Sequence, residues 1–234
     1  MTVKISGRIQ KEFSDWIVGD KFSCLAGKAS LRRGALAVVE LGQLGGADST
    51  RSLHQGLADF VSGRFFGGRD FQSYVAVFAG PSDTSELEFE RMLWRQLSDL
   101  ALIDNESFGW AEDVSAEPRS PDFAFSLAGH PLFVVGMHAN ASRISRRFPL
   151  PALAFNSHHQ FRRLKESGNF SGLQGKIRDR DIRLQGSINP NLAEFGEVSE
   201  ARQYSGRVAG RDWTCPISTF DTRRAVAAEA GTTP

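Results

Sequence analysis

The alternation of apolar and polar positions predicts a sheet in the middle of the chain. Residues 74–79 are apolar on both alternating faces, which is typical of a central strand covered on each side. Three further apolar runs predict strands at 123–127, 132–138 and 152–155, with a tight turn around Gly129 between the first two. Together these runs predict a small, mainly antiparallel central sheet.

Helical periodicity predicts the elements around that sheet. Ser85 and Glu88 have the spacing of a capping box, and apolar residues follow at helical spacing as far as Leu100. A weakly amphipathic segment spans 3–18, further helices are expected at 31–41, 48–61 and 158–167, and residues 175–184 fit either a helix or an exposed extended segment. The expected fold class is mixed α/β (α+β), with helices surrounding the sheet. A single domain at 1–224 would be followed by a flexible tail at 225–234.

Composition and charge narrow the class of protein. The chain has 234 residues, 41% of them hydrophobic, which suffices for one large domain with its own core. Its formal net charge of +1 argues against a general binder of nucleic acid, although residues 140–183 are strongly basic. No apolar run is long enough to span a membrane, and the first residues do not form a signal peptide. We therefore expect a cytoplasmic protein whose two cysteines are reduced.

The segment 133–161 carries the chemistry that stands out. It joins an apolar strand to Arg143, Arg146 and Arg147, between His138 and His158. Histidines at the edge of a buried sheet suit a metal, and a guanidinium holds an oxyanion with two parallel bonds. A histidine that caps the strand and a solvated arginine face are the alternatives. The spacings of zinc sites, Walker loops, dinucleotide fingerprints, nucleophile elbows and c-type haem attachment are missing from the sequence.

Several longer stretches of the sequence are more specific than any short motif. The blocks are 135–138, 146–148, 155–156, 184–190, 195–207 and 213–216, together with shorter matches around Cys24, Val75 and Trp94. In these blocks the sequence resembles the YqcI/YcgG family over roughly residues 20–217. The resemblance implies non-covalent haem b and O2-dependent N-hydroxylation of a guanidine or amine nitrogen. The implied substrate is arginine or a related small molecule, and electrons would come from an external reductase.

The resemblance also implies roles for particular residues. A haem iron needs an axial ligand, for which His158 and His138 are expected ahead of Cys24. The propionates need cations, and the expected partners are Arg143, Arg146 and Arg147.

A guanidinium substrate needs a carboxylate, for which Glu197 and Glu200 are expected. Pairing with neighbouring arginines is the alternative role of these two residues. A haem-binding sensor or carrier without turnover is the alternative function, and the sequence is compatible with a homodimer.

Overall fold

One five-stranded sheet organises the part of the chain that the structure describes. This computed structural model describes residues 7–63, 71–168, 170–191, 198–210 and 212–217. The strands are β1 (Leu36–Gln43), β2 (Ser73–Gly80), β3 (Phe125–Leu127), β4 (His130–Met137) and β5 (Ala152–Ser157). They lie in the order β1-β2-β5-β4-β3, with β1 parallel to β2 and the other neighbours antiparallel. The predicted mixed α/β fold with a mainly antiparallel sheet is confirmed.

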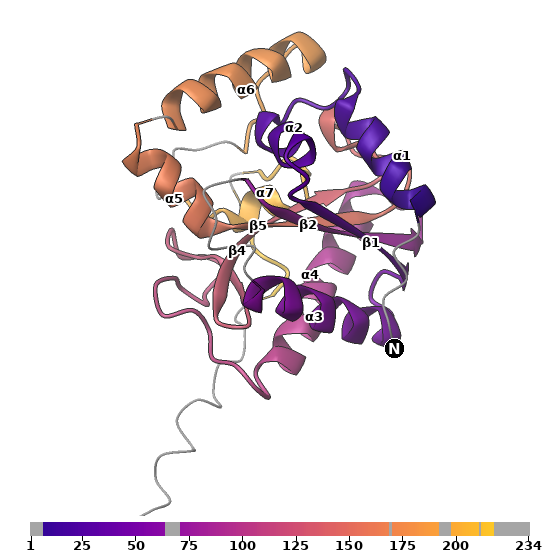
Figure 1. Ribbon diagram of the computed structural model, residues 1–234, viewed down its shortest axis with the longest axis vertical. Coiled ribbons are helices and arrows are strands. Elements are labelled where there is room, and N and C mark those ends of the chain that lie inside the picture. Colours follow the sequence, from indigo (N-terminus) through magenta and orange to yellow (C-terminus); the bar gives the residue numbers. More distant parts are fainter. Residues whose placement is uncertain (1–6, 64–70, 169, 192–197, 211, 218–234) are drawn as a thin grey trace, which may run out of the picture.

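Helices cover both faces of the sheet (Figure 1). They are α1 (Gly7–Val18), α2 (Leu25–Arg32), α3 (Ala47–Ser62), α4 (Glu86–Asp104), α5 (His158–Glu166), α6 (Phe170–Gln185) and α7 (Ala201–Tyr204), with a 3-10 turn η1 (Ile144–Arg146). Helices α3 and α4 lie below the sheet in this view, whereas α1, α2 and α6 lie above it. None of the described helices is long and apolar enough to cross a membrane.

Strand alternation divides the core into two layers. On β2, Tyr74 and Phe78 face α3 and α4 and belong to the larger apolar cluster, whereas Val75 and Val77 belong to the cluster that includes α1. This two-sided burial explains the unbroken apolar run of β2, because a central strand has no solvent face. The sheet thus has a densely filled lower face and an upper face shared between α1 and a cavity.

The helix predicted at 31–41 is wrong in its second half. Helix α2 ends at Arg32, Gly34 adopts φ +66°, and residues 36–43 form the edge strand β1 instead. Glycine adopts this left-handed conformation at little cost, so it breaks the helix where the periodicity ran on. The adjacent β-branched Val38 and Val39 favour a strand. The apolar stripe joined residues from two different elements.

The capping box that opens α4 is confirmed. The Ser85 hydroxyl accepts the Glu88 backbone N–H, and the Glu88 carboxylate accepts the Ser85 backbone N–H at 2.8 Å. Residues 175–184, for which two conformations were open, belong to helix α6. The tail expected at 225–234 lies outside the described residues.

Candidate functional site

A cavity of about 610 Å³ lies above the upper face of the sheet. Its floor includes short side chains on three strands, namely Val75 on β2, Val135 on β4 and Ala154 on β5, beside the larger Phe133 and Met137 of β4. On the opposite face the neighbouring positions carry large residues such as Tyr74 and Phe155. The small size of Val75, Val135 and Ala154 leaves space open above this part of the sheet.

The sulfur of Cys24 lies on the wall of this cavity, at the start of α2. Its Sγ accepts the Gly27 backbone N–H at 3.5 Å as the N-cap of the helix. Burial raises the pKa of the Cys24 thiol, while the helix N–H groups and the nearby Arg146 act in the opposite direction. The helix N-terminus and the charge of Arg146 both favour the thiolate form of Cys24. A metal bound to the sulfur would favour it further and would offset the effect of burial.

Arg146 lines the same cavity and bonds only to uncharged groups. Its guanidinium donates to the carbonyl oxygens of Gly136 at 3.0 Å, Tyr204 at 3.1 Å and Gln203 at 2.9 Å. Burial lowers its pKa to about 10, so the side chain stays protonated at neutral pH. Among the described residues no carboxylate forms an ion pair with Arg146. A guanidinium has five N–H groups, so donor capacity remains for an anion in the cavity.

The other two arginines of the predicted cluster differ from Arg146. Arg143 lines the cavity but is buried in an ion pair with Asp181, and it also donates to the Ser187 carbonyl at 2.9 Å. Arg147 donates to the carbonyl of Ala141 at 2.6 Å and does not line the cavity. The cluster is therefore neither one solvated face nor one anion site.

His158 and Glu200 meet at the edge of the cavity. The Nε2 of His158 lies 2.5 Å from Glu200 Oε2, and the Tyr204 hydroxyl lies 2.5 Å from Glu200 Oε1. Burial raises the pKa of Glu200, and the contact with His158 partly offsets this shift. Both oxygens of Glu200 are therefore engaged within the protein. Glu197, the other carboxylate predicted for the substrate, lies outside the described residues.

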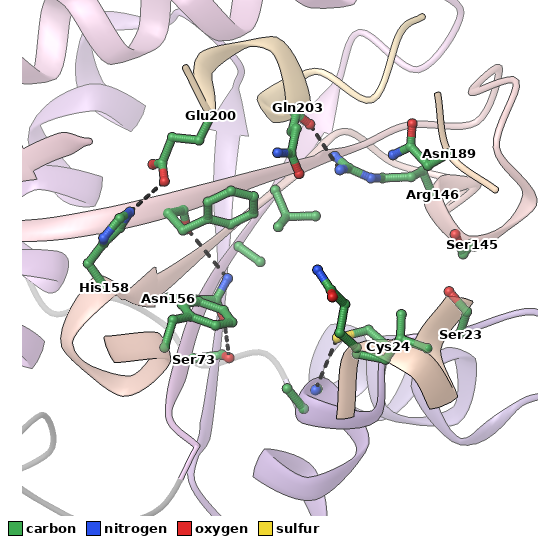
Figure 2. A pocket seen from close by; sticks show the side chains of 18 of the residues that line it. Ser23, Cys24, Ser73, Ser145, Arg146, Asn156, His158, Asn189, Glu200 and Gln203 are labelled. Carbon is green, nitrogen blue, oxygen red and sulfur yellow. Dashed lines mark hydrogen bonds and ion pairs between the residues drawn. The ribbon is translucent and has the colours of Figure 1, made fainter. Parts of the chain in front are cut away.

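The structure does not bring His138 to the cavity. Its ring is buried on the α4 side of the sheet and stacks on Phe89, with ring centroids 4.3 Å apart. Its Nδ1 has no hydrogen-bond partner, and burial lowers its pKa. Two of the predicted site residues that the structure describes, His138 and Arg147, do not line the cavity. The others line this one cavity, and they are Cys24, Arg143, Arg146, His158 and Glu200. Figure 2 shows four of these five around a common space.

Two polar residues on the cavity floor, Ser73 and Asn156, had no predicted role. Ser73 on β2 donates to Asn156 on β5, with 2.6 Å between Ser73 Oγ and Asn156 Oδ1. The signal that could have found them is their place in the alternation, since each occupies a cavity-facing position of an otherwise apolar strand. In pockets with mainly apolar walls, a few placed polar groups fix the orientation of the ligand.

Metal binding by the protein alone has no support in the described residues. No three of their His, Cys, Asp or Glu side chains converge where they could hold a metal ion. A haem iron differs because the porphyrin supplies four of its ligands, so one axial side chain from the protein suffices. A haem site therefore requires one axial ligand, an apolar slot for the porphyrin and cations for the propionates.

Comparison with known proteins identifies the family. The model of the YqcI/YcgG family matches residues 13–218. The chain is also 27% identical over 234 residues to "Uncharacterized protein YcgG" of Bacillus subtilis (strain 168), covering 90% of this chain and 91% of that protein. No solved structure matches the chain. The protein therefore belongs to the YqcI/YcgG family.

Proposed function

We propose that the protein is a haem-dependent oxygenase that hydroxylates a guanidine or amine nitrogen of a small molecule. The family resemblance suggests this activity. The single observation that carries the proposal is that Cys24 and Arg146 both line the same cavity. One residue offers a sulfur ligand, and the other is a cation that forms no ion pair with the described residues.

The cavity suits a haem in three respects. Its volume of about 610 Å³ lies within the range of about 300–1,000 Å³ that is usual for ligand pockets. Its lining is mainly apolar, as a slot for a porphyrin requires. Its lining includes a thiol that can ligate iron, that of Cys24, and a protonated guanidinium without an ion-pair partner among the described residues, that of Arg146.

Cys24 is the iron ligand that this arrangement favours. The Nε2 of His158 is taken by Glu200, and His138 lies outside the cavity lining. The N-cap position of Cys24 gives a thiolate an N–H donor and the positive end of a helix dipole. When bound, a haem with a thiolate ligand supplies O2 activation, since electron density from the sulfur favours O–O cleavage.

Arg146 is the residue that we propose for a propionate. Its remaining N–H groups and its charge have no anionic partner among the described residues, and a partly buried cation is stabilised by acquiring one. Arg143 is a weaker candidate because Asp181 already neutralises it. Arg147 has no part in this role, since it lies outside the cavity lining.

The residues around the substrate would orient a nitrogen and exclude water. Glu200 bonds His158 and Tyr204 with its two oxygens, so it positions His158 instead of serving as a free carboxylate for a guanidinium. The net reaction converts N–H to N–OH with one oxygen atom of O2. Two electrons from an external reductase and two protons reduce the other oxygen atom to water.

A product assay tests this function. The haem-loaded protein is mixed with a reductant, 18O-labelled O2 and, in turn, L-arginine, agmatine and L-lysine. We expect one of these compounds to yield a product that is heavier by one labelled oxygen atom. Haem that is bound and reduced, without product from any of the compounds, would contradict turnover and favour the sensor or carrier function.

A further inference from the structure

One polar row crosses the otherwise apolar floor of the cavity. Asn156 on the central strand β5 is paired in register with Ser73 on β2 and with Phe133 on β4. The next cavity-facing positions on these strands are Val75, Val135 and Ala154. Two adjacent polar side chains in such a floor cost free energy unless they bond to each other or to a ligand. Figure 2 shows both of them at the open space.

The bonds within the row fix how the Asn156 amide lies. Its Nδ2 donates to the Phe133 carbonyl at 3.4 Å, and its Oδ1 accepts the Ser73 hydroxyl at 2.6 Å. The Phe133 carbonyl can only accept, so the amide nitrogen must be the atom that faces it. An amide offers two N–H groups and two oxygen lone pairs. One of each therefore has no partner, in a side chain that lines the cavity.

The carboxylates that line the cavity are less available as acceptors than the Asn156 oxygen. Asp181 pairs with Arg143, Glu200 is engaged by His158 and Tyr204, and Asp113 pairs with Arg162. Each of these three carboxylates already has a partner within the protein, and the fourth lining carboxylate, Asp122, belongs to an exposed residue. A substrate N–H that enters over the floor therefore meets the Asn156 oxygen as an acceptor that is preset and has capacity left.

We propose that Asn156, held in place by Ser73, is a specificity-determining residue that binds the nitrogen group of the substrate. Its Oδ1 accepts an N–H of a guanidine or amine group and sets that nitrogen over the floor of the cavity. Ser73 is a positioning residue, because it affects substrate binding only by orienting the Asn156 side chain. The identity of the substrate group rests on the proposed function, whereas the location of the polar anchor does not.

Binding measurements on the full haem-loaded chain test the proposal without turnover. L-arginine, agmatine, L-lysine and putrescine are titrated by calorimetry into the parent protein and into Asn156→Leu, Asn156→Asp and Ser73→Ala. Loss of a hydrogen bond to a charged group weakens binding by roughly 10- to 100-fold, so Asn156→Leu should show a loss of this size. Asn156→Asp keeps an acceptor oxygen for the substrate but loses the donor to the Phe133 carbonyl, so it should bind the cationic compounds more tightly than Asn156→Leu does. Gln55→Leu, an amide replacement on the exposed side of α3, is the matched control and should leave binding unchanged.

The positioning role of Ser73 has its own readout. Ser73→Ala should weaken binding less than Asn156→Leu, and the double variant should bind no more weakly than Asn156→Leu alone, because the two residues act as one unit. Equal binding by the parent, Asn156→Leu and Ser73→Ala proteins overturns the proposal, as does the absence of binding by all four compounds. If Asn156→Leu does not fold, the binding affinities of Asn156→Asp and Ser73→Ala are compared with that of the parent. Affinities equal to that of the parent in both variants overturn the proposal. Binding that depends on Asn156 without any hydroxylated product refutes the oxygenase function alone.

Discussion

Glu200 Oε2 lies 2.5 Å from Nε2 of His158, although the two residues are 42 positions apart in the sequence. The second oxygen of Glu200 bonds the Tyr204 hydroxyl, which also accepts the Phe125 backbone N–H at 3.1 Å. This buried carboxylate connects the segment around α7 to the start of α5 and to the sheet. The contact shapes one edge of the cavity and stabilises the fold there.

Removal of this carboxylate should destabilise the protein. Breaking a buried charged pair by removing one partner costs about 3–5 kcal/mol, so Glu200→Ala should lower the free energy of unfolding by that amount. Urea denaturation of the parent and the variant measures the difference. Glu106→Ala, which alters an exposed carboxylate in the turn after α4, is the control and should change little. Equal stability of the Glu200→Ala and Glu106→Ala proteins would show that the buried contact contributes nothing.

The ion pair between Arg143 and Asp181 should show the asymmetry of buried charges. Both side chains are buried, and the pair joins α6 to η1. Asp181→Ala leaves the Arg143 charge without its partner and should cost about 3–5 kcal/mol. The double variant Arg143→Met with Asp181→Leu should recover much of this loss, since no charge is then left buried. A double variant less stable than Asp181→Ala would mean that the bonds of Arg143 to Ser187 matter more than the charge.

Gly136 should tolerate no side chain. A Cβ there would lie 2.7 Å from atoms of Leu93 and Phe89 and 2.9 Å from the Tyr204 carbonyl oxygen. Overpacking of a well-packed core typically costs about 1–3 kcal/mol, which we expect for Gly136→Ala in thermal or urea unfolding. Gly175→Ala in α6 is the control, because a Cβ at that position meets nothing within 4 Å. This control should instead stabilise its helix slightly. Equal effects at the two glycines would contradict the packing below the sheet.

The stability of the protein should depend on pH through His130. Burial, with help from the neighbouring His159, lowers the pKa of His130 from 6.5 to about 4. The unfolded chain therefore binds more protons between these values, so stability is full above pH 6.5 and falls as pH decreases towards 4. His130→Gln should keep a bond to the Ser157 hydroxyl and flatten this part of the profile. Parallel unfolding profiles of the parent and variant between pH 4 and 7 would refute this role of His130.

Local signals in the sequence predicted the elements that depend on local physics. The capping box at Ser85 and the two-sided apolar run of β2 are contained in a few neighbouring residues, and both are confirmed. Strand β1 was missed because its stripe of apolar residues, from Val38 to Leu41, also fits a helix. Its strand conformation depends on pairing with β2, more than thirty residues away.

The site could be predicted only in part, for the same reason. The resemblance indicated Cys24, Arg146 and Glu200 as site residues, and the structure brings all three to one cavity. It could not indicate that His158 and Tyr204 engage Glu200, or that His138 points to the α4 side of the sheet. Those relationships depend on strand register and on how distant segments pack together, which no local pattern encodes.

Titration of the purified protein with haemin tests the central claim most directly. We expect a saturable shift of the Soret band at one haem per chain, with a spectrum that changes in Cys24→Ser. Arg146→Gln should weaken haem binding by about 2–5 kcal/mol, as expected when one partner of a buried charged contact is removed. Arg147→Gln, which alters an arginine outside the cavity lining, should bind haem like the parent. A titration without any saturable Soret shift beyond that of an unrelated protein would contradict the account.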